Sequence, residues 1–323
     1  MFRKLTRGLA AAGLLAASFA HAQYPTKPIS ILVPFAAGGP TDTVARVMAQ
    51  AMTKPMGQTV VVENKPGAGG TIAAEYVAKA NPDGYTVLLH HIGMSTAPAL
   101  YRTLRFNSID SFEPIGLIAD VPMTLVARPG FPAKDMKELL AYVKANKAKV
   151  TYANAGIGSA SHLCGMLFMS AIETDLTTVP YKGTGPAMND LLGGQVDFMC
   201  DQTTNTTAQI KSGKIHAYGV TTKTRVPSLK DIPTLDEQGL KGFEVAVWHG
   251  MYAPKGTPKA VVDKLVSGLQ EALRDPTVKT RFNDLGTDPV AQDKATPAAL
   301  RTHLKAEIDK WTPLIKKAGV YAD

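Results

Sequence analysis

The chain has 323 residues, of which 45% are hydrophobic and 19% are charged, and this length and composition predict a globular protein of about two domains. The formal net charge is +8, yet no basic run is interleaved with aromatic residues, so nucleic-acid binding is not indicated. A modest positive excess of this kind suits a small anionic ligand.

Residues 1–22 have the features of a secretory signal peptide. Arg3, Lys4 and Arg7 form a positive start, residues 9–20 are apolar but too short to span a bilayer, and residues 20–22 form an A-x-A cleavage site. We therefore expect cleavage before Gln23 and a soluble periplasmic protein with a net charge of 8 − 3 = +5. No lipobox cysteine follows, so no lipid anchor is expected.

A strand, a glycine loop and a helix are predicted at residues 29–52. Residues 29–35 are apolar and partly β-branched, which is typical of a strand buried on both faces. Residues 36–39 permit a tight turn, and Pro40 suits the first turn of a helix. Such a loop presents unpaired N–H groups at a helix N-terminus and so indicates an anion site, although many glycine-rich turns bind nothing.

The first half continues with strands at residues 59–63 and 85–89, a second glycine loop at 64–70 and a helix at 71–80. His90 and His91 follow the second of these strands and point to opposite sides of an extended chain, which is poor geometry for joint metal ligation. We expect one of them to be packed or hydrogen-bonded and the other to be able to donate to an anion. Two further extended segments are predicted at 110–118 and 123–128, the latter connecting two domains.

The second half repeats this arrangement. Strands are predicted at residues 150–153, 176–180, 195–200 and 215–221, with a helix at 136–144. Gly/Ser/Thr loops are predicted at 154–162 and 181–186, and each is followed by a helix. Residues 245–253 are extended and return to the first domain, which amphipathic helices at 260–273 and 297–318 cover. The alternation predicts an α/β fold of two units, each turning its loops towards the ligand-binding edge of an open sheet.

Cys164 and Cys200 are the two cysteines of the chain. An oxidising periplasm permits a disulfide between them, but the sequence does not show their separation in space. We favour two buried free thiols, and without a C-x-x-C motif or a His/Cys cluster we expect no metal site.

Neutral hydrogen-bond donors dominate the predicted loops. They bind carboxylates without catalysing a reaction, and neither a G-x-x-x-x-G-K-[ST] phosphate loop nor a G-x-S-x-G elbow occurs. We therefore expect a binding protein with no catalytic residues and no cofactor. An exported hydrolase using Ser159 or Ser161 with His162 is one alternative, and a sensor that presents its ligand to a signalling partner is another.

Seven segments resemble the Bug family, the TctC-like extracytoplasmic solute receptors of tripartite tricarboxylate transporters. They cover essentially the whole mature chain in collinear order, at residues 28–46, 60–70, 80–88, 152–162, 179–187, 193–201 and 248–258. The resemblance implies a two-lobed periplasmic binding protein of the type II Venus-flytrap class, with a central cleft that closes on a carboxylate. It also implies delivery to a permease of a large and a small membrane subunit. Within this pattern we place the signal peptide at 1–22, lobe 1 at 23–122 and 248–323, and lobe 2 at 123–247, and we expect a monomer.

The family's binding loops carry over to both lobes, and Asp201 lies where a lobe 2 strand meets the cleft. This chain departs from many relatives at residues 90–94, where Ile92 and Met94 would make the wall more apolar. The departure favours a mono- or dicarboxylate with an aromatic or aliphatic core over citrate or an amino acid. The expected ligand-binding residues are Phe35, Ala37, Gly38, Gly39, Thr41, Asp42, His91, Met94, Gly158, Ser159, Ser161, His162, Thr184 and Asp201.

Overall fold

The computed structural model describes residues 24–322, so the predicted signal peptide lies outside the described residues. The first part of the chain contains β1 (Ile29–Val33), α1 (Pro40–Met56), β2 (Val60–Asn64), η1 (Ala68–Gly70), α2 (Thr71–Ala78), β3 (Thr86–His91), α3 (Gly93–Leu100) and β4 (Phe112–Ala127). The middle part contains α4 (Met136–Ala145), β5 (Thr151–Asn154), α5 (Ala160–Ala171), β6 (Thr177–Pro180), α6 (Thr184–Leu192), β7 (Phe198–Gln202), α7 (Thr203–Lys211), β8 (His216–Val220) and η2 (Pro227–Leu229). The last part contains β9 (Ala246–Pro254), α8 (Lys259–Arg274), α9 (Pro276–Asp284) and α10 (Pro297–Ala318).

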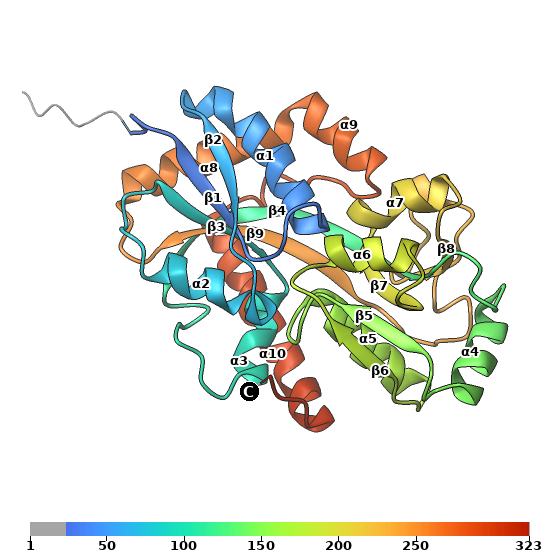
Figure 1. The fold of residues 1–323 in the computed structure, drawn as a ribbon. Helices are drawn as coiled ribbons and strands as arrows, with labels where there is room; N and C mark the ends of the chain where they lie inside the picture. The colour runs from blue at the N-terminus through green and yellow to red at the C-terminus, as the bar shows by residue number, and fades with distance from the viewer. Residues whose placement is uncertain (1–23, 323) are drawn as a thin grey trace, which may run out of the picture.

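One half of the molecule is a sheet covered by helices on both faces (Figure 1). Its strand order is β2-β1-β3-β9-β4, with β1 parallel to β2 and β3 and with β9 antiparallel to β3. Alternate side chains of β1 face opposite ways, so Ile31 joins the core under α1 and α8 while Leu32 joins the core under α2 and α10. The predicted strand buried on both faces is thereby confirmed.

The other half repeats this layering with β4-β7-β5-β6, and β8 pairs with the other side of β4. Tyr152 of β5 packs with α4 and α5, whereas its neighbour Ala153 packs with α6. In Figure 1 these helices lie on opposite faces of the short strands. The carboxyl ends of β5 and β7 point towards the first half of the molecule, because residues at both ends line a cavity together with residues of that half.

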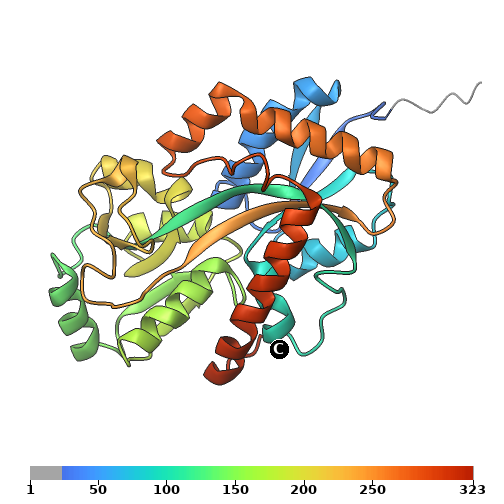
Figure 2. The ribbon, with the colours of Figure 1, turned by 180° about the vertical axis from the view of Figure 1, so that it is seen from behind.

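The long strand β4 joins the two halves. Its pairing with β9 runs as far as Pro122, and from Met123 onwards it pairs with β7 and β8 instead. Figure 2 shows β4 and β9 crossing side by side between the halves. The segments predicted at 110–118 and 123–128 are both extended, but they belong to one strand and not to two. Shifts of register between Pro114 and Gly116 and between Leu117 and Ala119 let the strand continue.

Three helices were not predicted, namely α3, α7 and α9. The first contains Pro98 and small residues, and α7 begins with Thr-Thr-Asn-Thr-Thr, a run of weak helix formers. Their local sequences do not favour a helix strongly, so tertiary packing decides their conformation. Over residues 24–322, no helix is both long enough and apolar enough to cross a membrane.

Cys164 of α5 and Cys200 of β7 form a disulfide with a Cα–Cα distance of 6.1 Å. The expectation of two free thiols is therefore wrong. The sequence separation of 36 residues did not reveal that the first turns of α5 pack directly on β7. The bond ties together two elements whose ends meet at the cleft.

Candidate functional site

Four helices begin at the wall of one small cavity between the two halves. The cavity has a volume of about 10 Å³, room for about one water molecule, so the two halves are tightly closed. Its wall includes the first turns of α1, α5 and α6 and the residue that precedes α7. The lining residues are Phe35, Pro40, Thr41, His91, Ala155, Ser159, Ala160, Ser161, Thr184, Asp201 and Gln202.

The electrostatic character of this cavity comes from helix ends. The first N–H groups of a helix have no partner within the helix, and they carry the positive end of its dipole. No lysine or arginine is among the lining residues from the described part of the chain. Apart from Asp201, the lining residues are therefore neutral, and the helix starts present preorganised N–H donors that suit an anion.

Asp42 holds the first glycine loop in place. Its carboxylate accepts hydrogen bonds from the Gly38 N–H at 3.0 Å, from Asn64 Nδ2 at 2.9 Å and from Arg46 Nε at 2.8 Å. Burial alone would raise the pKa of Asp42, but these hydrogen bonds outweigh burial and lower it. Asp42 therefore shapes the loop and does not line the cavity.

His91 presents a neutral ring to the cavity. Its Nδ1 accepts the Gly93 N–H at 2.9 Å, which leaves Nε2 to carry the ring proton. The ring stacks on Phe35 with centroids 4.7 Å apart. Burial lowers the pKa of His91 well below its usual value, with the nearby rings of His90 and His249 adding to the effect. At neutral pH this ring is an uncharged hydrogen-bond donor.

The two adjacent histidines do face different ways. His90 Nδ1 accepts the His91 N–H at 2.7 Å, and its ring bonds the Gly70 backbone in the second glycine loop. Burial lowers the pKa of His90 to about 3. His90 is thus hydrogen-bonded within the protein, as expected for one of the pair, whereas His91 lines the cavity.

Two serines on α5 form a short hydrogen-bond chain. Ser161 Oγ accepts the Ala155 N–H at 2.8 Å, and Ser159 Oγ accepts the His162 N–H at 3.2 Å as the N-cap of the helix. The two hydroxyl groups lie 3.1 Å apart, so one donates to the other. That leaves one hydroxyl proton for a ligand in the cavity.

Asp201 is a buried acid at the end of β7. Its Oδ1 accepts the Gln202 N–H at 2.9 Å and its Oδ2 accepts Asn205 Nδ2 at 2.5 Å. Burial raises the pKa of Asp201 to about 6, against the effect of these bonds. The Thr184 hydroxyl also lies near enough to lower this pKa, but it makes no hydrogen bond of normal geometry within residues 24–322.

The halves meet through hydrogen bonds to backbone carbonyl groups at the rim of the cavity. The Ala36 N–H donates to the Lys182 carbonyl oxygen at 2.9 Å, and the Tyr101 hydroxyl donates to the Ile157 carbonyl oxygen at 3.0 Å. A Cβ built on Gly185 would lie 3.0 Å from the backbone of the first glycine loop. Glycine at this position therefore permits the loops to approach this closely.

Half of the expected binding residues line the cavity, namely Phe35, Thr41, His91, Ser159, Ser161, Thr184 and Asp201. The loop residues Ala37, Gly38, Gly39 and Gly158 instead belong to the rim, and Asp42 and His162 lie behind it. Ile92 and Met94 pack in the hydrophobic core with Leu88 and Leu100. The prediction of an apolar wall at residues 92–94 is therefore wrong, because α3 turns both side chains away from the cavity.

The serine and histidine pattern does not have the geometry of a nucleophile and its base. His162 Nδ1 accepts the Gly158 N–H at 3.4 Å, and no bond between its ring and either serine hydroxyl occurs in the described part of the chain. A serine hydrolase needs that bond. The serines instead serve as acceptors for backbone N–H groups.

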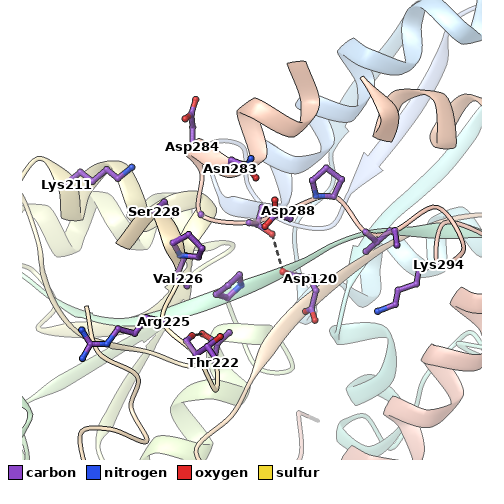
Figure 3. Close-up of a pocket in the computed structure, with 18 residues that line it drawn as sticks. Asp120, Lys211, Thr222, Arg225, Val226, Ser228, Asn283, Asp284, Asp288 and Lys294 are labelled. Atoms are coloured by element: carbon purple, nitrogen blue, oxygen red, sulfur yellow. Dashed lines mark hydrogen bonds between the residues drawn. The ribbon is translucent and has the colours of Figure 1, made fainter. Parts of the chain in front are cut away.

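A larger hollow of about 750 Å³ lies on the other side of β4 (Figure 3). Arg225 and Lys211 stand on one side of it, Asn283 and Asp284 on another, and Asp120 lies on β4. Lys211 and Asp284 are the last residues of α7 and α9, so the helix ends here carry the negative side of the dipole. The smaller cavity, where helix N-termini meet, is therefore the candidate anion site.

The model of the tripartite tricarboxylate transporter receptor family matches residues 44–320. The chain belongs to this family. The predicted Bug-type, TctC-like membership is confirmed, and so is the predicted α/β fold of a periplasmic binding protein.

Solved structures similar to this receptor extend the comparison. The periplasmic binding protein BugD is 58% identical, with a TM-score of 0.91 over 92% of this chain and 99% of its own. MatC from Rhodopseudomonas palustris, solved with malate, is 40% identical, with a TM-score of 0.88 over 90% of this chain and 100% of its own. Another R. palustris protein, solved with adipate, is 33% identical, with a TM-score of 0.87 over 92% of this chain and 99% of its own. The chain thus shares its fold with periplasmic binding proteins of this family, and two of the similar proteins were solved with a carboxylate.

Four lining residues of the receptor were missed by sequence reasoning, namely Pro40, Ala155, Ala160 and Gln202. Pro40, Ala155 and Ala160 lie inside loops or helix starts that the sequence predicted. Gln202 was missed because the predicted strand stopped at Cys200, two residues before β7 ends. Because α7 was not predicted either, the position of Gln202 directly before a helix could not be recognised from the sequence.

Proposed function

We propose that this protein is an extracytoplasmic receptor that closes two lobes on a carboxylate and delivers it to a membrane permease with a large and a small subunit. The observation that carries the proposal is the convergence of four helix N-termini on a cavity without a lysine or arginine among its described lining residues. Such a site favours an anion that can be released again, because no ion pair holds it. The protein binds its ligand without chemical turnover.

The two lobes consist of residues 23–122 with 248–323 and of residues 123–247. The change of strand partner at Met123 supports this division, because β4 pairs with β9 before it and with β7 and β8 after it. The cavity of about 10 Å³ is too small for a dicarboxylate, so ligand entry requires the lobes to separate. A ligand held by donors from both lobes then shifts the population towards the closed state.

Export to the periplasm through a cleaved signal peptide of residues 1–22 completes the proposal. The charged, apolar and A-x-A segments of those residues support it. N-terminal sequencing of the secreted protein should begin at Gln23. If the protein delivers its ligand to the permease, cells that lack either the receptor gene or the permease genes should lose uptake of the ligand.

A thermal-shift screen tests the binding function. Aromatic dicarboxylates, aliphatic diacids, hydroxy acids and acidic amino acids are compared with their uncharged amides at pH 7.5. A ligand at 100 times its Kd should add about 2.7 kcal/mol to the free energy of unfolding, and its amide should add nothing. Small-angle scattering should show a more compact protein with the ligand. If no carboxylate raises the melting temperature above its amide, the proposal fails.

A further inference from the structure

The outer surface of α2 carries exposed apolar side chains beside a loop where the two lobes touch. Ile72 and Tyr76 of α2 are 44% and 50% exposed, and Ile157, in the loop before α5, is 39% exposed. The other large hydrophobic side chains of residues 24–322 that are exposed to this extent are Val61, Leu314 and Tyr321. Single exposed apolar residues are ordinary, whereas a group of them indicates a surface that a partner covers.

The boundary between the lobes runs through this group. Gly69, just before α2, lies so close to the Ile157 carbonyl oxygen that a Cβ would not fit between them. The Tyr101 hydroxyl donates to the same oxygen at 3.0 Å. Ile72 follows Gly69 by about one helical turn. Because Ile72 and Tyr76 belong to lobe 1 and Ile157 belongs to lobe 2, the three side chains are held together only while the lobes are closed.

A groove of about 630 Å³ lies beside the lobe 1 part of this group. Ile72 and Tyr76 line it together with Thr86 at the start of β3. Thr86 is in register with Ser30, and Ser30 with Val61, so the three side chains share one face of the sheet. Exposed Val61 therefore continues the floor of the groove to β2, the last strand of the sheet. A protein segment can enter such a groove, whereas a flat lipid surface cannot.

Two lysines stand at this groove on aromatic rings. Lys65 Nζ lies 4.3 Å from the centroid of the Tyr76 ring, and Lys27 Nζ lies 4.3 Å from that of the Tyr85 ring. Both lysine side chains are exposed. An ammonium group in this position contacts the ring with one side and can still pair with a carboxylate on the other.

The two acids that line the groove are engaged within the protein. Glu75 pairs with Lys79 at 2.6 Å, and Asp83 accepts the Tyr85 N–H at 3.0 Å. Lys27 and Lys65 are therefore the charged groups left for a partner. Interfaces place opposite charges against each other, so the groove favours a partner with carboxylates around an apolar anchor.

We propose that Ile72, Tyr76, Ile157, Lys27 and Lys65, which we call the seam surface, dock a segment of the membrane permease that has an apolar anchor flanked by acidic residues. This inference rests on the proposed function and adds a docking surface to it. Separation of the lobes parts Ile157 from Ile72 and Tyr76, so the permease binds the closed, loaded receptor in preference to the open, empty one.

Binding to the purified permease tests the proposal. Its large and small subunits are placed in nanodiscs of phosphatidylcholine, and the mature receptor is added with and without malate, adipate or another acid that raises its melting temperature. We expect the loaded receptor to bind the permease at least about tenfold more tightly than the empty one.

Ile72→Ser combined with Tyr76→Ser removes the apolar part of the seam surface on lobe 1. This double variant should bind the permease at least about tenfold more weakly and should keep its affinity for the acid, because neither side chain lines the cavity. Leu314→Ser is the matched control, since Leu314 is 46% exposed on α10 and does not line the groove. Lys65→Glu leaves the apolar side chains in place and should also weaken docking.

The outcomes separate this inference from the proposed function. Unchanged docking of the double variant and of Lys65→Glu would overturn the inference while the receptor function stands, and so would equal docking of the empty and the loaded receptor. Equally tight binding to nanodiscs of anionic lipid without the permease would overturn it in favour of a membrane contact. If the unaltered receptor binds a carboxylate but not the permease, delivery fails and the inference fails with it.

Discussion

Gly39 and Gly185 lie against each other across the cleft, and a Cβ built on Gly39 would be 3.3 Å from the Gly185 nitrogen. The first belongs to the loop before α1 and the second to the first turn of α6. Two helix N-termini are therefore brought together by residues without side chains. Closure of the cavity depends on this approach.

Gly185→Ala should weaken ligand binding at least about tenfold, or about 1.4 kcal/mol, without lowering the stability of the free protein. The new methyl group would lie 3.0 Å from Ala37 O, Gly38 C and Gly39 N, which are backbone atoms that cannot turn away. Calorimetry with a ligand from the thermal-shift screen measures the change. Gly193→Ala at the other end of α6 is the matched control, because its Cβ would lie 3.4 Å from its nearest neighbour. Equal effects of the two substitutions would contradict a closure role for Gly185.

Asp42→Asn should lower the free energy of unfolding by about 1–3 kcal/mol at pH 7 and also weaken ligand binding. The buried carboxylate holds Gly38, Asn64 and Arg46, and an amide can accept at only one of its two ends. Because the pKa of Asp42 is lowered, its stabilising contribution is present above the unfolded value of 3.8 and is lost as pH falls through the folded pKa. Urea unfolding of both proteins measures the difference. Arg46→Gln should lower the free energy of unfolding by less than Asp42→Asn does, since the Arg46 side chain is 54% exposed. A larger loss of stability in Arg46→Gln would contradict this account.

Stability should decrease as pH falls from about 6.5 towards 3. The folded pKa values of His90 and His249 are about 3 and that of His91 is also lowered, all chiefly by burial, so the unfolded chain binds more protons in this window. Asp201 acts in the opposite direction between about 3.8 and 6, because its folded pKa is raised. Burial also lowers the pKa of His162 and of His303 and raises that of Asp120. More protons therefore favour unfolding than oppose it, and the net slope should be roughly 1–3 kcal/mol per pH unit in mid-window.

Urea unfolding between pH 7.5 and 5 measures this slope. His249→Gln should make it shallower, because one of the buried groups no longer titrates. A stability that stays constant over this range would show that the buried rings do not titrate as proposed.

Replacing Cys164 and Cys200 together with alanine should destabilise the protein by about 2–4 kcal/mol, because the unfolded chain is released from a loop across 36 residues. It should also weaken ligand binding, since the disulfide ties α5, which carries Ser159 and Ser161, to the residue before Asp201. Urea unfolding and calorimetry measure the two effects. An unchanged affinity would mean that packing alone positions these two elements.

Local sequence was sufficient for the elements that carry a strong periodic signal. The apolar run before Phe35, the glycine loop and the helix after Pro40 are found as predicted, and α8 and α10 differ from the predicted helices by at most a residue at each end. The helices α3 and α7 were missed because their Thr, Pro and small residues leave the local preference weak. For the same reason Met94 was placed at the cavity, although the turn of α3 buries it in the core.

The sequence by itself determined that this is an α/β protein of a receptor family whose loops present neutral donors, because buried strands, glycine turns and helix starts are local patterns. Only the tertiary structure decided which loops meet, since the distance between Gly39 and Gly185 or between Cys164 and Cys200 depends on packing across more than 30 residues. It also decided the role of each acid. Asp42 lies in the first turn of α1 and Asp201 lies near the end of β7. Arg46 and Asn64 hold the first away from the cavity, whereas the position of the second in β7 places it in the cavity wall.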